Sequence, residues 1–163
     1  MRNLNFGCGR SLRVGWDNCD VQKGERIISF DFNKFPYPFK DNTYDLIESR
    51  SVLQMLNEPD NVLDELWRIA KNGARINIEV PYWNNKGAYN DIQTKHIFNE
   101  NSFINFAEQK PCRVDTKIKL KIRKIEIDST KVGRLFPEAL RKKLNLFFSG
   151  IYSNMKIEFE VIK

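Results

Sequence analysis

Two glycines near the start of the chain end a short apolar run. Leu4-Asn5-Phe6 reads as a strand, and Gly7-Cys8-Gly9 follows it directly. A strand that ends in Gly-x-Gly lets the backbone turn sharply, so that a ligand can lie against bare main chain. Two glycines also occur in ordinary strand-to-loop turns, so this motif alone is only a weak indication of a nucleotide site.

Acidic residues follow the next three predicted strands. Asp20 ends the second strand, where a carboxylate can hold two ribose hydroxyls. Asp31-Phe32 follows the third strand, where a side chain and a backbone N–H can read an adenine edge, and Glu48-Ser49-Arg50 ends the fourth. Ligands of doubly wound sheets bind outside the C-terminal ends of the strands. The ordering favours a nucleoside site over a chance set of loop acids.

A nicotinamide dinucleotide is the natural competitor for such a site. Its fingerprint requires a third glycine three residues after Gly9, where this chain has Leu12. It also requires an acidic residue about 20 residues further on, after a helix, and Asp20 comes too soon for that. No glycine-rich or basic cradle for a pyrophosphate is present. A ligand with ribose and adenine but without phosphates, such as S-adenosylmethionine, fits better.

Short apolar runs alternate with helical patterns along the chain, which predicts an α/β fold with a mainly parallel sheet. Asn57 is a suitable N-cap for the clearest helix, and Gly73 is suited to the left-handed position that ends it. Prolines make 35–39 a loop. Strands are predicted at 2–6, 17–21, 26–30, 44–49, 75–80, 117–127 and 156–162, and helices at 57–71, 101–108 and 137–151.

Several motifs together resemble the short-loop, type 11-like branch of the class I, Rossmann-like, S-adenosylmethionine-dependent methyltransferases. They run in the family's order and cover about residues 3 to 106. In this family a strand is followed by Gly-Cys-Gly, a brief loop, a Gly-aromatic pair and a second strand that ends in Asp. Residues 4–9 and 15–20 match this pattern. The other matching stretches are 35–47, 65–75, 78–81 and 95–103.

The resemblance implies a single domain over residues 1–163, with a mainly parallel sheet of about seven strands whose last strand is antiparallel. It also implies S-adenosyl-L-methionine as the cofactor. The expected cofactor-binding residues are Phe6, Gly7, Cys8, Gly9, Asp20, Val21, Asp31, Phe32, Glu48, Ser49 and Arg50.

The chain departs from the family at positions near the reaction centre. The family's His-x-x-Glu-His after strand four is replaced by Ser51, Gln54 and Met55, and Thr94 stands where a histidine is common. The Gly-Gly after the helix is Gly73-Ala74. These changes bear on catalysis more than on cofactor binding, so a non-catalytic cofactor-binding module is an alternative function.

His96 is the candidate general base, because histidine changes its charge near neutral pH. A lone histidine is also a common packing or hydrogen-bonding residue, and Glu48 and Asp91 are weaker candidates. After strand five, an acceptor pocket is predicted at Tyr82, Trp83, Asn84 and Tyr89. The alternative is that Trp83 covers the core or a loop.

Positive charge is concentrated at the C-terminal end. The chain has a net charge of +6, and residues 111–163 hold 13 Lys/Arg against 6 Asp/Glu. This basic region is expected to form a sheet edge and an amphipathic helix at 137–151. The helix could pack on its own sheet, form a dimer contact or lie on an anionic membrane surface. A small molecule, glycan or lipid-linked intermediate is the first choice of acceptor, and nucleic acid or protein is the alternative.

The cysteines bear on metal binding, and the N-terminal sequence bears on the location of the protein. Cys8, Cys19 and Cys112 have unrelated spacings and only one histidine is present, so no metal site is predicted. The sequence has no apolar run long enough to span a membrane and begins without a signal-peptide pattern, so a cytoplasmic location is expected.

Overall fold

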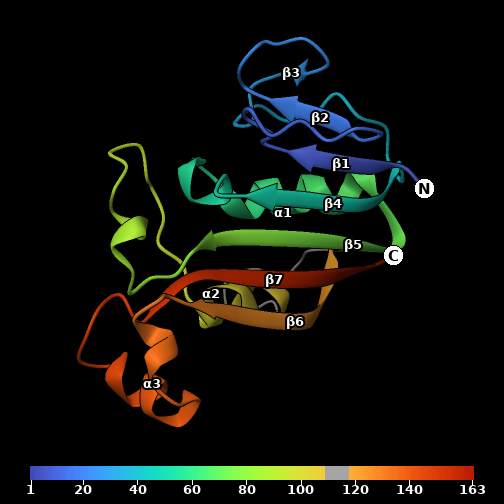
Figure 1. Ribbon diagram of the computed structural model, residues 1–163. Coiled ribbons are helices and arrows are strands. Elements are labelled where there is room, and N and C mark those ends of the chain that lie inside the picture. The colour runs from blue at the N-terminus through green and yellow to red at the C-terminus, as the bar shows by residue number, and fades with distance from the viewer. Residues whose placement is uncertain (109–117) are drawn as a thin grey trace.

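The computed structural model describes residues 1–108 and 118–163. It contains one sheet with the strand order β3-β2-β1-β4-β5-β7-β6 (Figure 1). The neighbours from β3 to β5 are parallel, and β7 runs antiparallel to both β5 and β6. The predicted mainly parallel sheet with an antiparallel last strand is confirmed. The strands are β1 (Asn3–Phe6), β2 (Asp17–Asp20), β3 (Ile28–Ser29), β4 (Tyr44–Arg50), β5 (Ala70–Pro81), β6 (Lys119–Ser129) and β7 (Tyr152–Ile162).

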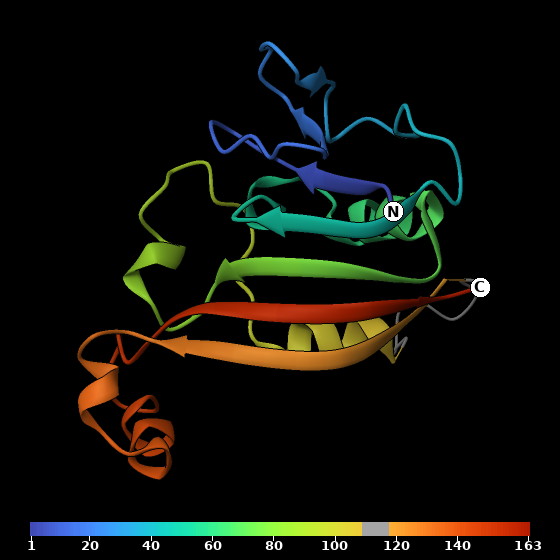
Figure 2. The same ribbon diagram turned by 45° about the vertical axis from the view of Figure 1, so that its right-hand side comes forward.

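Two helices, α1 (Pro59–Ile69) and α2 (Glu100–Ala107), lie against the same face of the sheet (Figure 1). A third helix, α3 (Glu138–Leu144), belongs to the connection between β6 and β7. This connection projects from the end of the sheet at which the parallel strands terminate (Figure 1). Single 3₁₀ turns occur at η1 (Leu53–Met55), η2 (Lys86–Ala88) and η3 (Gly133–Leu135). The two chain termini lie at the other end of the sheet, where the parallel strands begin, as both ribbon views show (Figure 2).

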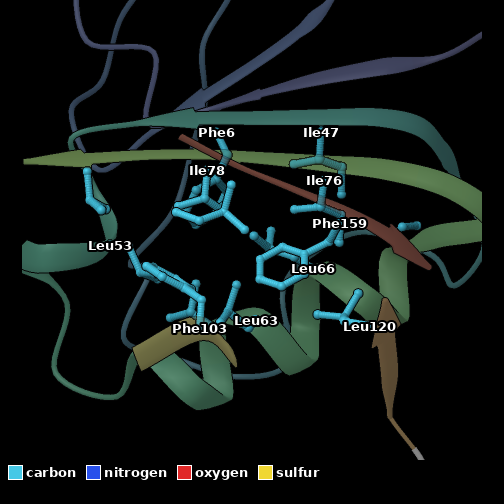
Figure 3. Packing of buried hydrophobic residues seen from close by; sticks show 14 of the residues in the cluster. Phe6, Ile47, Leu53, Leu63, Leu66, Ile76, Ile78, Phe103, Leu120 and Phe159 are labelled. Atoms are coloured by element: carbon cyan, nitrogen blue, oxygen red, sulfur yellow. The ribbon is translucent and has the colours of Figure 1, made fainter. Parts of the chain in front are cut away.

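The hydrophobic core fills the space between the sheet and the two helices α1 and α2. Leu66 of α1 and Phe103 of α2 are almost fully buried, as are Ile76 and Ile78 of β5 and Phe159 of β7 (Figure 3). Leucine and valine recur at helical spacing along α1, which gives that helix its apolar face. Burial of these side chains fixes which face of each strand is turned inward.

The opposite face of the sheet is polar. Successive side chains of a strand point to opposite faces, so Asn77 and Glu79 alternate with the buried isoleucines of β5 and are themselves half-buried. Charged neighbours on this face form ion pairs across strands, such as Arg75 with Glu158 at 3.8 Å. Among the described residues, no helix covers this face (Figure 2).

The first predicted helix has different ends in the structure. It begins at Pro59 with Glu58 in the N-cap position, whereas Asn57 had been predicted as the cap. It ends at Ile69, because β5 begins at Ala70 and pairs immediately with β4. Gly73 does have a positive φ of 75°, but it lies inside β5 at an irregularity in the pairing, not after a helix. Strand pairing therefore overrides the local helical signal.

Two other predicted elements are shorter than expected. Only Ile28–Ser29 of the predicted strand 26–30 pairs with β2. Of the predicted helix 137–151, only Glu138–Leu144 forms α3. Residues 145–147 continue as a turn, which a hydrogen bond from the Phe148 N–H to the Leu144 carbonyl closes. Lys117 and Cys112 lie outside the described residues. Within the described ranges, no helix is long and apolar enough to cross a membrane.

Candidate cofactor and acceptor site

The glycine loop lies where the winding of the sheet reverses. β1 has β2 on one side and β4 on the other, so the loop after β1 is at the topological switch point where α/β proteins bind ligands. Gly7 has a φ of 75°, and a Cβ there would lie only 2.1 Å from Cγ2 of Val52. Gly9 has a φ of 50°, but a Cβ there would meet no atom within 4 Å. Gly7 is required for packing, while the space beside Gly9 is open.

The Asp20 carboxylate faces this loop from the end of β2. One oxygen accepts a hydrogen bond from the Gly9 N–H at 2.7 Å, and the other accepts from the Gln22 N–H at 3.0 Å. Only 8% of Asp20 is exposed. A carboxylate has about four lone-pair sites, so two backbone donors leave capacity for hydroxyl groups of a ligand. The structure thus brings the glycine loop and the predicted ribose-binding acid together.

A short loop, and not a helix, connects β1 to β2. Two buried amides hold it over the polar face of the sheet: Asn5 donates to the Ser11 carbonyl at 2.9 Å, and Asn18 donates to the Arg13 carbonyl at 3.0 Å. The two amides also join each other at 2.9 Å. Sequence reasoning missed both residues, although an asparagine inside an apolar strand was an available signal.

The same loop carries Arg13 to the end of β4. Its guanidinium lies 2.5 Å from the Glu48 carboxylate and stacks over the Trp16 ring at 4.4 Å. Glu48 therefore has a cationic partner and stands beside the loop that follows β1. Ser49 is buried, and Arg50 is exposed with its Nε 3.7 Å from Glu79.

A groove of about 230 Å³ runs from these residues along the open face of the sheet. Polar and charged side chains of four strands line it, among them Glu48, Asn77, Glu79 and Lys156. The groove is continuous with the end of β4 and lies on the face that carries no helix in the described chain. Its position differs from that of the open space beside Gly9, which lies at the loop after β1.

The third acidic position lies at the start of the loop after β3. Asp31 is exposed and its carboxylate accepts the Asn33 N–H at 3.0 Å. The Phe32 ring is buried and stacks on Phe6 with centroids 4.1 Å apart. Phe6 and Phe32 therefore offer a ligand their backbone and not their side chains. Val21, directly after Asp20, is 55% exposed.

His96 lies against the loop that follows β4. Its Nε2 is 3.1 Å from the Asn57 carbonyl oxygen, which can only accept, so Nε2 carries the proton of the neutral ring. The backbone N–H groups of Lys95 and His96 both donate to the Gln54 carbonyl. Gln54 is 7% exposed, and its Oε1 has no hydrogen-bond partner among the described residues. His96 thus stands beside the positions where the chain departs from the family pattern.

The aromatic residues after β5 have different environments. The Tyr82 hydroxyl is buried beside the Glu100 carboxylate at 3.2 Å, and burial raises the pKa of Tyr82. Trp83 is 37% exposed and Tyr89 is 61% exposed, with the Tyr89 hydroxyl donating to the Trp83 carbonyl. The Asn84 amide donates to backbone carbonyls of the β6–β7 connection. These four positions lie at one edge of the sheet, and their contribution to an acceptor pocket stays a prediction.

Both a known sequence family and several solved structures are similar to this chain. Residues 11–78 match the family model described as a methyltransferase domain. A methyltransferase from Archaeoglobus fulgidus described as S-adenosylmethionine-dependent superimposes with a TM-score of 0.68 at 14% identity, covering 98% of this chain and 86% of that one. One from Mesorhizobium loti gives 0.66 at 11% identity, with 98% and 90% covered. The chain therefore has the fold of these S-adenosylmethionine-dependent methyltransferases, and residues 11–78 match the methyltransferase-domain model.

Another solved structure with a similar fold contains S-adenosyl-L-methionine. Phosphoethanolamine N-methyltransferase 2 from Haemonchus contortus, in complex with S-adenosyl-L-methionine, has a TM-score of 0.64 at 13% identity. The match covers 100% of this chain but only 49% of that enzyme, so this chain spans about half of that enzyme's length. No curated protein sequence matches this chain.

The two cysteines of the described residues have buried thiols. Cys8 and Cys19 are free and buried, and desolvation raises the pKa of both thiols. Cys8 lies between the two glycines, so its thiol is next to the open space without being ionised at neutral pH. Over residues 1–108 and 118–163, no group of three or more His, Cys, Asp or Glu side chains could hold a metal ion.

Proposed function

We propose that this domain binds S-adenosyl-L-methionine at the loop after β1 and transfers its methyl group to a small molecule, a glycan or a lipid-linked intermediate. The open space beside Gly9, faced by the Asp20 carboxylate, carries the proposal. It lies at the switch point of a sheet whose fold is that of the class I methyltransferases.

The residues around this space suit a nucleoside without phosphates. Asp20 has lone pairs for ribose hydroxyls, and the exposed side chain of Val21 can lie against a ring. Asp31 and the Phe32 N–H, which makes no hydrogen bond to the described residues, offer an acceptor and a donor to an adenine edge. β1 is followed by a loop and not by a helix, so there is no helix N-terminus at which a pyrophosphate would bind.

When bound, the cofactor would supply a methyl group that its sulfonium activates for transfer, because the neutral thioether left behind is a good leaving group. The chain's own contribution is to position two reactants, which can account for much of a rate enhancement. Gly9 keeps a side chain out of the binding space, and the Asn5–Asn18 amide pair holds the loop that carries Arg13 to Glu48.

His96 is the proposed general base. Because Nε2 donates to the Asn57 carbonyl, Nδ1 is the ring nitrogen that can accept a proton from an acceptor group. Replacing His96 with Ala should lower methyl transfer by about 10²- to 10⁴-fold and leave cofactor affinity unchanged. An unchanged rate with a proton-bearing acceptor would assign His96 to loop packing instead.

The experiment that tests the cofactor site is calorimetric titration with S-adenosylmethionine and S-adenosylhomocysteine. Wild type should bind both. Asp20→Ala should weaken binding by about tenfold or more, since hydrogen bonds to a charged group contribute about 1.5–3 kcal/mol. Asp20→Asn, which keeps one acceptor for the loop, should also bind more weakly. Asp60→Asn, an exposed carboxylate in the first turn of α1, is the matched control.

Circular dichroism and thermal unfolding of each variant separate a lost ligand contact from a lost fold. If well-folded wild type binds neither compound, the proposed cofactor is wrong. If Asp20→Ala binds as tightly as Asp60→Asn, the cofactor lies elsewhere on the domain.

A non-catalytic cofactor-binding module is the second candidate. It is favoured by Gln54 and Met55, which replace the family's acidic residue and histidine beside the predicted site. That function predicts cofactor binding without turnover on any acceptor. Methyl transfer to nucleic acid would instead require binding of RNA or DNA that weakens steeply with salt. The cytoplasmic location and the single-domain organisation stay predictions.

A further inference from the structure

The connection between β6 and β7 forms a projecting module, residues 131–149, hereafter the 131–149 module. Figures 1 and 2 show it extending from the edge where the parallel strands end. Its neck is closed by Thr130, whose hydroxyl donates to the Gly150 carbonyl at 2.6 Å and accepts from the Gly133 N–H at 3.0 Å. A Cβ at Gly133 would lie 2.0 Å from the Ile151 carbonyl oxygen, so the neck has no room for a larger residue.

The 131–149 module exposes six of its large apolar side chains. Only Gly133 and Asn145 are buried within it, so it has no core of its own. Six exposed apolar residues are concentrated in this short segment, whereas large apolar groups on a soluble surface are usually scattered singly. Their exposed fractions are 57% for Val132, 78% for Leu135, 42% for Leu140, 74% for Leu146, 81% for Phe147 and 59% for Phe148.

The same segment is strongly basic. Lys131, Arg134, Arg141, Lys142 and Lys143 accompany a single acid, Glu138. Glu138 lies 3.0 Å from the Lys142 ammonium group, and both side chains are 70% exposed. The 131–149 module therefore combines exposed leucine and phenylalanine with excess positive charge, which is the combination found in segments that lie in the interface of anionic membranes.

Hydrogen bonds fix the module relative to the site. The Asn84 amide donates to the Asn145 carbonyl at 2.6 Å and to the Phe148 carbonyl at 3.2 Å, and the Asn84 carbonyl accepts the Gly150 N–H at 3.1 Å. Asn84 belongs to the loop after β5, where the acceptor residues are predicted. Whatever the module binds is therefore held at the same edge of the sheet as that loop.

We propose that the 131–149 module docks on the surface of an anionic lipid bilayer. Its excess of cations complements anionic headgroups, and its leucine and phenylalanine side chains can enter the headgroup–acyl boundary. A symmetric dimer through this module would bring two cationic surfaces together, which is unfavourable. Nucleic acid would match the charge, but most of the exposed apolar side chains are aliphatic and cannot stack on bases. Docking would bring the predicted acceptor loop to the lipid surface, a consequence that rests on the proposed function.

Vesicle flotation without cofactor tests this proposal. The probes are vesicles of phosphatidylcholine alone and of phosphatidylcholine with about 30% phosphatidylglycerol, whose surface attracts basic segments. The protein should float with the anionic vesicles and not with the neutral ones. Lys131→Gln with Lys143→Gln should weaken anionic binding by about 25-fold, since each basic residue contributes about fivefold near such a surface.

A second pair of substitutions tests the contribution of the module's exposed apolar side chains to vesicle binding. Leu146→Ser with Phe147→Ser should weaken binding by about tenfold or more. Ile162→Ser is the matched control and should bind like wild type, because this isoleucine is 39% exposed and lies near the C-terminus, at the end of the strands opposite the module. Equal flotation with neutral and anionic vesicles, unchanged binding by the Leu146/Phe147 variant, or a concentration-dependent dimer abolished by that variant would each overturn the proposal. The titration with S-adenosylmethionine is independent, because the double serine variant should retain it.

Discussion

The two glycines after β1 should respond differently to alanine. Both have a positive φ, 75° at Gly7 and 50° at Gly9, and an alanine in the left-handed region costs about 1–2 kcal/mol. At Gly9 that is the whole cost, because the added Cβ meets no atom within 4 Å. We therefore expect Gly9→Ala to remain folded but to fill space that the cofactor needs, which should weaken S-adenosylmethionine binding by about 10- to 100-fold.

At Gly7 a packing cost is added to the backbone cost. The new Cβ would lie 2.1 Å from Cγ2 and 3.2 Å from Cγ1 of Val52, and overpacking costs about 1–3 kcal/mol. Gly7→Ala should therefore lose about 2–5 kcal/mol, out of the roughly 5–15 kcal/mol that stabilises a typical domain. Val52→Ala removes both methyl groups and leaves its Cβ at 3.2 Å, so it should restore the packing part of the loss but not the backbone part.

Urea unfolding followed by tryptophan fluorescence, with calorimetric titration of each folded variant, measures these effects. The four proteins needed for the Gly7/Val52 pair form a double-mutant cycle, in which we expect a favourable coupling of about 1–3 kcal/mol. Two outcomes would refute the reasoning. If Gly9→Ala binds the cofactor like wild type, the open space is not the binding space; if Gly7→Ala is as stable as Gly9→Ala, the contact with Val52 does not restrict Gly7.

Three further predictions concern charge, anchoring and reactivity. The hydrogen bond from the Lys71 ammonium group holds the pKa of Asp45 below its ordinary value of 3.8, so the ion pair stabilises the fold above that pH and loses this effect as the pH falls further. Asp45→Asn should therefore unfold at a lower urea concentration than wild type at pH 7, and the difference should vanish in acid. Asn84→Ala removes the donor to the Asn145 carbonyl and should speed amide hydrogen exchange in α3 but not in the sheet; unchanged exchange would contradict the anchoring role. Burial raises the pKa of Cys8, so peptide-resolved alkylation at neutral pH should be slower than in urea and should accelerate with rising pH; equal rates would contradict this.

The local sequence was sufficient for the elements whose signals are short-range. Alternation of apolar and polar residues gave β5 and β6 their inward faces, and apolar residues at helical spacing gave α1 its buried stripe. The paired glycines and the acids at three strand ends gave the position of the candidate site, because a parallel sheet places all those ends at one edge.

Residues far apart in sequence decided the rest. The C-terminal end of α1 follows from the pairing of Ala70 with Tyr44, and the place of Gly73 follows from the irregular register beyond it. The conformation of the loop after β1 depends on Asn5 and Asn18, whose amides become useful only when β1 and β2 are paired. Neither interaction has a local signature.

Sequence periodicity identified an amphipathic segment near 137–151 but did not say what its apolar side would face. That depended on where the β6–β7 connection leaves the sheet and on the hydrogen bonds that Asn84 makes to it. Periodicity reports which residues share a face of a helix. Whether that face meets the core or solvent is a property of the tertiary contacts, and here they leave Leu146 and Phe147 exposed.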